Sequence, residues 1–194
     1  MPKHSVALKS ATPDAWVQPI LENFDTFLQD HANCERKASA LAMSMVVKQP
    51  DRERIIPTLI AIAREELLHF EQVYELMRER GLGLVKDEPD PYVNALLADI
   101  RHGREDRFLD RLLTFSLVEC RGAERFGILC QALTDPELAR FYRTLWGAEV
   151  KHGDQFVAMA LEYFKPDVVY ARLEQLAERE AEIVATLPWR PSLH

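Results

Sequence analysis

Two pairs of residues in this sequence combine a carboxylate and an imidazole at the same spacing. Glu66 and His69 form one Glu-x-x-His pair, and Glu149 and His152 form the other. Residues three apart on a helix lie on one face, so each pair would present an oxygen ligand and a nitrogen ligand together. Carboxylate and imidazole ligands suit iron or manganese better than they suit thiolate-preferring metals. The spacing therefore predicts a metal site capable of redox chemistry with dioxygen.

Each pair interrupts a helical stripe that is otherwise mostly apolar. Such a stripe, with apolar residues every three or four positions, is typical of a helix that faces a core. The first stripe is Ile55, Leu59, Ile62, Glu66, His69, Val73 and Leu76. The second stripe is Leu138, Tyr142, Leu145, Glu149, His152, Phe156, Met159 and Tyr163. Both pairs are therefore predicted to be buried at the middle of a helix.

Two further stripes each carry one central glutamate, Glu35 or Glu119. Glu35 precedes Glu66 by 31 residues, and Glu119 precedes Glu149 by 30. In antiparallel helical hairpins these offsets bring the carboxylates to one height. A buried carboxylate without a partner costs several kcal/mol, and two divalent metals would balance four of them. We therefore predict a dimetal centre, with no catalytic residue beyond its ligands: Glu35, Glu66, His69, Glu119, Glu149 and His152.

The elements that must position these ligands are all predicted to be helices. Glycine is scarce, at 7 of 194 residues, and long segments follow a helical period. The predicted long helices span residues 23–48, a segment ending at Arg80, 105–133, a segment ending at Phe164, and 167–187. A long connection, 81–103, contains a short helix near 92–101. This order predicts one domain, residues 1–194, with a ferritin-like four-helix bundle, one long crossover and an extra C-terminal helix.

Composition predicts a cytoplasmic protein with no membrane span. No apolar run approaches the roughly 20 residues that a span needs, and three cysteines without C-x-x-C spacing favour reduced thiols. The net charge of -7 argues against a broadly basic nucleic-acid-binding surface. One local cluster is basic, although acidic residues are interleaved with it: Arg101, His102, Arg104, Arg107 and Arg111. A solvated helix face explains this cluster best, and it is also the best local candidate for phosphate contacts.

Several residues near the proposed ligands are given structural roles. His31 lies one turn before Glu35, and a hydrogen-bonded core histidine is favoured over a ligand. Cys34 and Cys120 adjoin proposed ligands but point in other directions, so both are predicted to be packing thiols. Four other glutamates fall off the stripes and are predicted to be solvated: Glu65, Glu71, Glu75 and Glu124.

Three segments around the proposed ligands resemble the bacterial tRNA hydroxylase family called MiaE. They are residues 63–71, 118–126 and 148–152, which read AREELLHFE, VECRGAERF and AEVKH. The resemblance implies a ferritin-like, non-haem di-iron monooxygenase that hydroxylates the isopentenyl group of 2-methylthio-isopentenyl-adenosine next to the tRNA anticodon. It also implies two Fe ions, dioxygen as co-substrate, tRNA as substrate and an external electron donor, either a protein or a reductant. The family's ligand pattern maps onto the same six residues.

Other functions fit the dimetal pattern without an RNA substrate. A ferritin-like protein could oxidise iron for storage or reduce peroxide, and a purely structural bundle would bind no metal. Storage ferritins usually lack the histidine of the second pair, whereas this chain has both. A rubrerythrin-like peroxidase with its own electron-transfer domain would carry a cysteine-based iron site, for which this sequence has no pattern. A metal-free bundle would leave four carboxylates buried.

Overall fold

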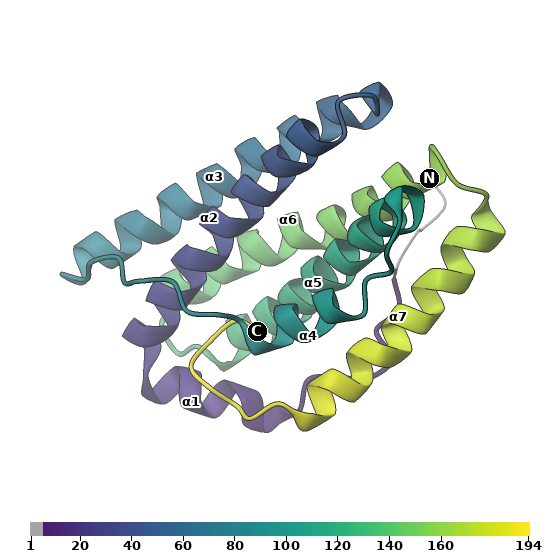
Figure 1. The fold of residues 1–194 in the computed structure, drawn as a ribbon. Helices are drawn as coiled ribbons and strands as arrows, with labels where there is room; N and C mark the ends of the chain where they lie inside the picture. Colours follow the sequence, from purple (N-terminus) through teal and green to yellow (C-terminus); the bar gives the residue numbers. More distant parts are fainter. Residues whose placement is uncertain (1–5) are drawn as a thin grey trace. The chain divides into compact units, whose positions relative to one another are not determined.

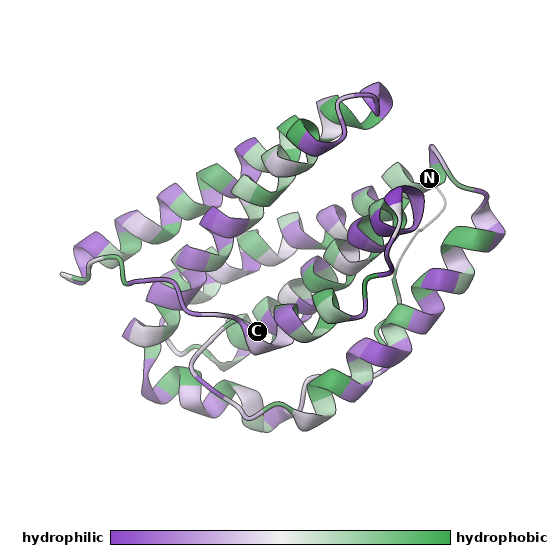
Figure 2. Ribbon diagram, viewed as in Figure 1, coloured by the Kyte–Doolittle hydropathy of each residue, from purple (hydrophilic) through white to green (hydrophobic). Residues whose placement is uncertain are grey.

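The structure is a computed structural model that describes residues 6–194, and it contains helices and no strand in that range. The elements are η1 (Asp14–Trp16), α1 (Val17–Glu22), α2 (Phe24–Lys48), η2 (Glu53–Ile55), α3 (Ile56–Glu79), α4 (Pro91–Ala98), α5 (Arg104–Ala132), α6 (Pro136–Leu161) and α7 (Pro166–Thr186) (Figure 1). Hydrophobic and hydrophilic residues alternate along the long helices (Figure 2). The all-α prediction is confirmed.

The described residues form two compact units, which we describe in turn. The first unit contains Gln18–Glu88 and Trp189–Leu193, and the second contains the described residues up to Val17, Pro89–Pro188 and His194. The single domain predicted for residues 1–194 stays a prediction, and residues 1–5 of it lie outside the described range.

The first unit is built around the helices α2 and α3, which run side by side (Figure 1). Apolar residues on their facing sides, including Phe27, Leu28 and Leu59, have no exposed surface. The α3 helix ends where Gly81 adopts a positive φ of 71°, and the backbone N–H of Leu82 donates to the Met77 carbonyl oxygen at 2.9 Å. This left-handed end is common for glycine because it has no β-carbon to clash.

The second unit is built around α5 and α6, with α4 and α7 packed beside them. The side chain of Asp135 begins α6 by accepting hydrogen bonds from the backbone N–H groups of Glu137 (2.8 Å) and Leu138 (3.2 Å). Asp90 begins α4 in the same way, and each aspartate is followed by a proline that starts the helix. The start of each helix is therefore set by an aspartate that caps it and a proline in its first position.

The observed boundaries of the long helices lie close to the predicted ones, and two local differences have physical causes. The short helix α4 ends at Ala98, and Arg101 is held outside it because its backbone N–H donates to Asp110 at 2.9 Å. A proline usually kinks or ends a helix, but Pro19 lies inside α1. It is the third residue of that helix, where a missing N–H breaks no helical hydrogen bond. No helix within residues 6–194 is long and apolar enough to cross a membrane.

Candidate metal centre

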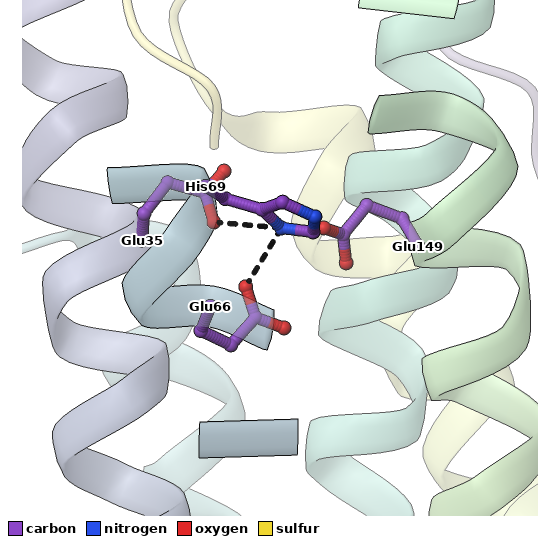
Figure 3. Close-up of side chains that lie close together, drawn as sticks. All are labelled: Glu35, Glu66, His69 and Glu149. Atoms are coloured by element: carbon purple, nitrogen blue, oxygen red, sulfur yellow. Dashed lines mark hydrogen bonds and ion pairs between the residues drawn. The ribbon is translucent and has the colours of Figure 1, made fainter. Parts of the chain in front are cut away.

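Three of the predicted ligands come together in the first unit. Glu35 projects from α2, and Glu66 and His69 project from α3 (Figure 3). The Nδ1 atom of His69 lies 3.3 Å from Oε2 of Glu66 and 3.7 Å from Oε2 of Glu35. All three side chains are buried, with 5% exposure or less, and their potential ligand atoms lie within 4.8 Å of one another. We call these three residues the first half-site.

The other three predicted ligands come together in the second unit. Glu119 projects from α5, and Glu149 and His152 project from α6. The Nδ1 atom of His152 lies 3.1 Å from Oε2 of Glu149, and the potential ligand atoms of all three residues lie within 4.8 Å of one another. Glu149 and His152 are buried, whereas Glu119 is half-buried. These three residues form the second half-site, and its α6 pair repeats the arrangement of Glu66 and His69.

The donor set of each half-site fits a metal ion of the iron type. Each half-site offers two carboxylates and one imidazole, which are the ligands that iron and manganese accept in proteins. In both Glu-x-x-His pairs an imidazole nitrogen faces a carboxylate oxygen, so a proton or a cation must lie between them. A bound metal ion would replace that proton and would neutralise the buried carboxylates.

One serine in each unit joins the two ligand-bearing helices close to the half-site. Ser39 Oγ of α2 donates to the Ala63 carbonyl oxygen of α3 at 2.7 Å. Ser116 Oγ of α5 donates to the Gly153 carbonyl oxygen of α6, also at 2.7 Å. Each bond lies within about one helical turn of a proposed ligand on both helices. These bonds set the register of each helix pair and so the relative height of its ligands.

Comparison with known proteins identifies the family. The family described as tRNA-(MS[2]IO[6]A)-hydroxylase (MiaE) matches the chain over residues 1–194. The chain belongs to the MiaE family. It is 33% identical to the tRNA 2-(methylsulfanyl)-N(6)-isopentenyladenosine(37) hydroxylase of Pseudomonas putida, over 95% of the chain and 89% of that protein. It is 26% identical to the protein of the same name from Salmonella typhimurium, over 91% of the chain and 83% of that protein.

A solved structure supports the same fold. The protein described as "Protein 43 with aldehyde deformylating oxygenase activity from Synechococcus" superposes with a TM-score of 0.89 at 34% identity. The match covers 96% of this MiaE-family chain and 94% of the Synechococcus chain. Together with the all-helical structure, it confirms the predicted ferritin-like class.

The proposed ligand Glu35 of this MiaE-family chain has a close polar neighbour on its own helix. His31 Nε2 lies 2.6 Å from Glu35 Oε1, and His31 is fully buried, with its ring stacked on Phe27. This geometry confirms the prediction of a hydrogen-bonded core histidine. Such a bond fixes the orientation of a metal-binding carboxylate from outside the coordination sphere.

A buried ionic network beside Glu119 was missed by sequence reasoning. Arg121 has no exposed surface, and its guanidinium donates to both carboxylate oxygens of Glu180 on α7, at 2.7 and 2.9 Å. It also pairs with Glu124, whose other oxygen accepts from the backbone N–H of Thr12. The prediction that Glu124 is solvated is therefore wrong. The available signal was the sequence LLTFSL at 112–117, which has no charged residue on any side of the helix and so indicates that α5 lies at the centre of its unit.

The ionisation of this network follows from its burial and its partners. Burial lowers the pKa of Arg121, but the hydrogen bonds and charge of Glu180 outweigh that effect and raise it above the ordinary value. Arg125 is also buried, and there burial lowers the pKa to about 10, which still leaves the group charged at neutral pH. The network ties α5 to α7 and to the N-terminal segment.

The three cysteines are free thiols in this structure. Burial, together with the nearby charge of Glu119, raises the pKa of Cys120 to about 12. Cys120 therefore keeps its proton at neutral pH, and thiols without a thiolate form are poor metal ligands. Both observations agree with the predicted packing role.

One member of the basic cluster at the start of α5, Arg101, is neutralised within its own unit. Arg101 pairs with Asp106 at 3.0 Å and with Asp110 at 2.8 Å, and Arg107 contacts His102. Asp110 is completely buried and also accepts from Arg172 at 2.8 Å. Arg101 therefore has a structural role, and the cluster offers less free positive charge than its sequence predicts.

Proposed function

We propose that this chain hydroxylates the isopentenyl group of 2-methylthio-isopentenyl-adenosine next to the anticodon of tRNA. The observation that carries the proposal is the pair of half-sites, each with two carboxylates and one imidazole, in a chain of the MiaE family. The names of the relatives from Pseudomonas putida and Salmonella typhimurium support the same substrate. A tRNA substrate also implies a cytoplasmic location.

The two half-sites would supply the ligands of two iron ions. Glu35, Glu66 and His69 would supply three ligands, and the other three would be Glu119, Glu149 and His152. Two divalent ions carry four positive charges, which would balance the four carboxylates of this set. Six protein ligands shared by two ions would leave coordination positions for dioxygen and water.

When bound, the iron pair supplies the two-electron activation of dioxygen that an unactivated C–H bond requires. The balanced reaction takes the prenyl C–H, one O2, two electrons and two protons to the alcohol and one water. The two electrons come from an external donor. The four carboxylates hold the ions, and the two histidines provide neutral nitrogen ligands. His31 orients Glu35 through its hydrogen bond, and the buried surroundings of Glu66 and Glu149 limit the access of water.

The test is the conversion of tRNA that carries the unhydroxylated modification. Purified iron-loaded protein is incubated with this tRNA, air and a chemical reductant, and the nucleosides are analysed by mass spectrometry after digestion. The proposal predicts a gain of one oxygen atom in the modified adenosine, derived from O2 in an isotope-labelling experiment. An unchanged nucleoside with iron-loaded, reduced protein would refute it.

A second candidate is the oxidation of an aldehyde. The solved Synechococcus protein, which is described as having aldehyde deformylating oxygenase activity, is 34% identical to this chain and shares its fold. The same iron-loaded protein should therefore be incubated with an aldehyde, reductant and air, and the release of formate should be measured. Formate release without tRNA hydroxylation would favour this activity over the proposed one.

The remaining alternative is a di-iron protein that oxidises iron or reduces peroxide without an RNA substrate. It predicts oxygen or peroxide consumption that is indifferent to tRNA. The proposed hydroxylase predicts reductant-driven oxygen consumption that increases when the modified tRNA is added. A metal-free structural bundle predicts no consumption of oxygen or peroxide. It also predicts no iron in the purified protein, whereas the di-iron alternatives predict about two iron ions per chain.

A further inference from the structure

The outward side of α6 carries a row of basic side chains. Arg140, Arg143 and Lys151 are exposed, and Gly147 lies in the same row between them. Residues three or four apart on a helix lie above one another, so the row extends for about 16 Å. Trp146 flanks it and is 38% exposed. We call these five residues the α6 basic face.

The charge of this face is not neutralised within the described part of the chain. The only acidic residue between Arg140 and Lys151 is Glu149, which is buried on the opposite side of the helix. The side chains of Arg140, Arg143 and Lys151 form no ion pair with any carboxylate among residues 6–194. The row thus concentrates positive charge on one face of a chain whose net charge is -7. Such a row attracts a polyanion.

Gly147 leaves the middle of the row without a side chain. A glycine inside a helix costs about 1 kcal/mol relative to alanine. A β-carbon at Gly147 would meet no atom of the described residues within 4 Å, so packing inside the protein does not explain the glycine. The bare backbone there allows a ligand to approach the helix closely between Arg143 and Lys151.

Trp146 supplies a fixed aromatic surface beside the row. A β-carbon at Gly127 on α5 would lie 3.2 Å from Cε2 of the indole, so the ring packs closely against this glycine. The ring is thus held against α5 while more than a third of the side chain remains in solvent. Held aromatic rings are the surfaces on which unpaired RNA bases stack.

We infer that the α6 basic face binds the single-stranded anticodon loop of the tRNA substrate. Arg140, Arg143 and Lys151 contact loop phosphates, and Trp146 stacks on an unpaired base. Phosphate contacts of this kind fix the position of the RNA without reading its sequence. The face lies on the side of α6 opposite Glu149, so the loop is held about one helix diameter, roughly 10 Å, from the second half-site. This inference rests on the proposed function, because that function makes tRNA the substrate.

The test compares two double variants that remove the same charge from the same unit. Arg140→Ala/Arg143→Ala removes half of the row, and Arg104→Ala/Arg107→Ala removes two exposed arginines from the cluster at the start of α5. Each is titrated with fluorescently labelled tRNA that carries the unhydroxylated modification, at several salt concentrations. Circular dichroism and iron content establish that both variants are folded and loaded.

We expect the Arg140→Ala/Arg143→Ala variant to bind about tenfold more weakly than wild type, with the slope of log K against log salt smaller by about 1.4. The Arg104→Ala/Arg107→Ala control should bind within about twofold of wild type. Trp146→Leu should weaken binding at least about fivefold, whereas Trp146→Phe should retain most of it because phenylalanine can still stack. Equal losses in the two double variants, or none in Arg140→Ala/Arg143→Ala, would overturn the inference.

Hydroxylation by the wild-type protein separates this inference from the proposed function. If wild type modifies the tRNA and Arg140→Ala/Arg143→Ala binds it normally, the α6 basic face is not the tRNA-binding surface, and the proposed function is supported. If wild type binds tRNA through this face and leaves the nucleoside unchanged, the tRNA-binding surface is supported and the proposed hydroxylase function is refuted.

Discussion

The sulfur of Cys120 on α5 fills the space in which a β-carbon on Gly153 of α6 would lie. Cys120 follows the proposed ligand Glu119, and Gly153 follows His152. The close approach of the two helices therefore occurs at the second half-site, where Ser116 also donates its hydrogen bond to the Gly153 carbonyl oxygen at 2.7 Å. A side chain larger than hydrogen at residue 153 must displace the Cys120 sulfur or separate the two helices.

The first prediction concerns this contact. Gly153→Ala places a methyl group against the Cys120 sulfur, and overpacking of this kind typically costs about 1–3 kcal/mol. Gly147→Ala is the matched control, because it is a glycine of the same helix whose added β-carbon meets nothing. We expect Gly153→Ala to be less stable than Gly147→Ala by about 1–3 kcal/mol in thermal unfolding, although both gain the same helix propensity.

Rescue by a second substitution shows whether the sulfur is the cause. Cys120→Ala removes that atom, so Gly153→Ala combined with Cys120→Ala should recover most of the lost stability. A double variant that is as unstable as Gly153→Ala would contradict the proposed clash.

The second prediction concerns Glu119, the least buried of the proposed ligands. Glu119→Ala should reduce bound iron from about two ions per chain to one or fewer. It should reduce tRNA hydroxylation by more than the 10–100-fold that is typical when only a residue supporting a ligand is lost. Helical content should be largely unchanged, because Glu119 lies inside a 29-residue helix.

Glu71→Ala is the control for this experiment. Glu71 lies two residues beyond His69 and is exposed, so its removal should leave iron content and activity near wild type. Iron analysis, activity and circular dichroism would be measured on both variants. Retention of both iron and activity in Glu119→Ala would remove Glu119 from the ligand set.

The sequence was sufficient to predict the helices and the composition of each half-site. The Glu-x-x-His spacing and the apolar stripes depend only on helical periodicity, and periodicity is the strongest local signal that a sequence carries. Glu35 and Glu119 were found because each is the central polar residue of its stripe. These predictions needed no knowledge of long-range contacts.

The sequence could not predict features that depend on contacts between distant segments. Arg121 is buried because Glu180, 59 residues later, meets it with two hydrogen bonds. Arg101 looks like a free cation in the sequence, and it is neutralised by a buried aspartate. Periodicity describes one helix at a time, so it does not reveal which charges find partners in another element.

The third prediction concerns the support of Glu35 by His31. The 2.6 Å contact from Nε2 to the Glu35 carboxylate is buried, so its loss leaves the carboxylate free to rotate. His31→Leu should weaken iron binding by about 10–100-fold, as expected for loss of a residue that orients a ligand. His31→Gln, which keeps a donor, should weaken it less. Competition with a chelator measures the iron affinity of both variants. Equal losses of affinity in the two variants would contradict an orienting role for His31.

The fourth prediction concerns the dependence of stability on pH at Asp110. Burial raises the pKa of this carboxyl group, but hydrogen bonds from Arg101 and Arg172 outweigh burial and hold the pKa below its ordinary value. A pKa that is lower in the folded state stabilises the protein above the unfolded-state value, about 3.9, and this stabilisation is lost as the pH falls towards the folded-state pKa. The carboxylate should therefore contribute fully at neutral pH.

Asp110→Asn removes the charge and keeps the shape, so it tests this contribution directly. At pH 7 we expect a loss of about 3 kcal/mol, the lower end for breaking a buried ion pair, because Arg101 keeps part of its surface in water. The difference between wild type and variant should shrink as the pH falls below about 4, since the Asp110 carboxyl group of the unfolded wild type then gains a proton while that of the folded protein is still ionised. Urea unfolding at pH 7, 5 and 3.5 measures this difference, and a difference that is constant over the three values would mean that the charge of Asp110 does not stabilise the fold.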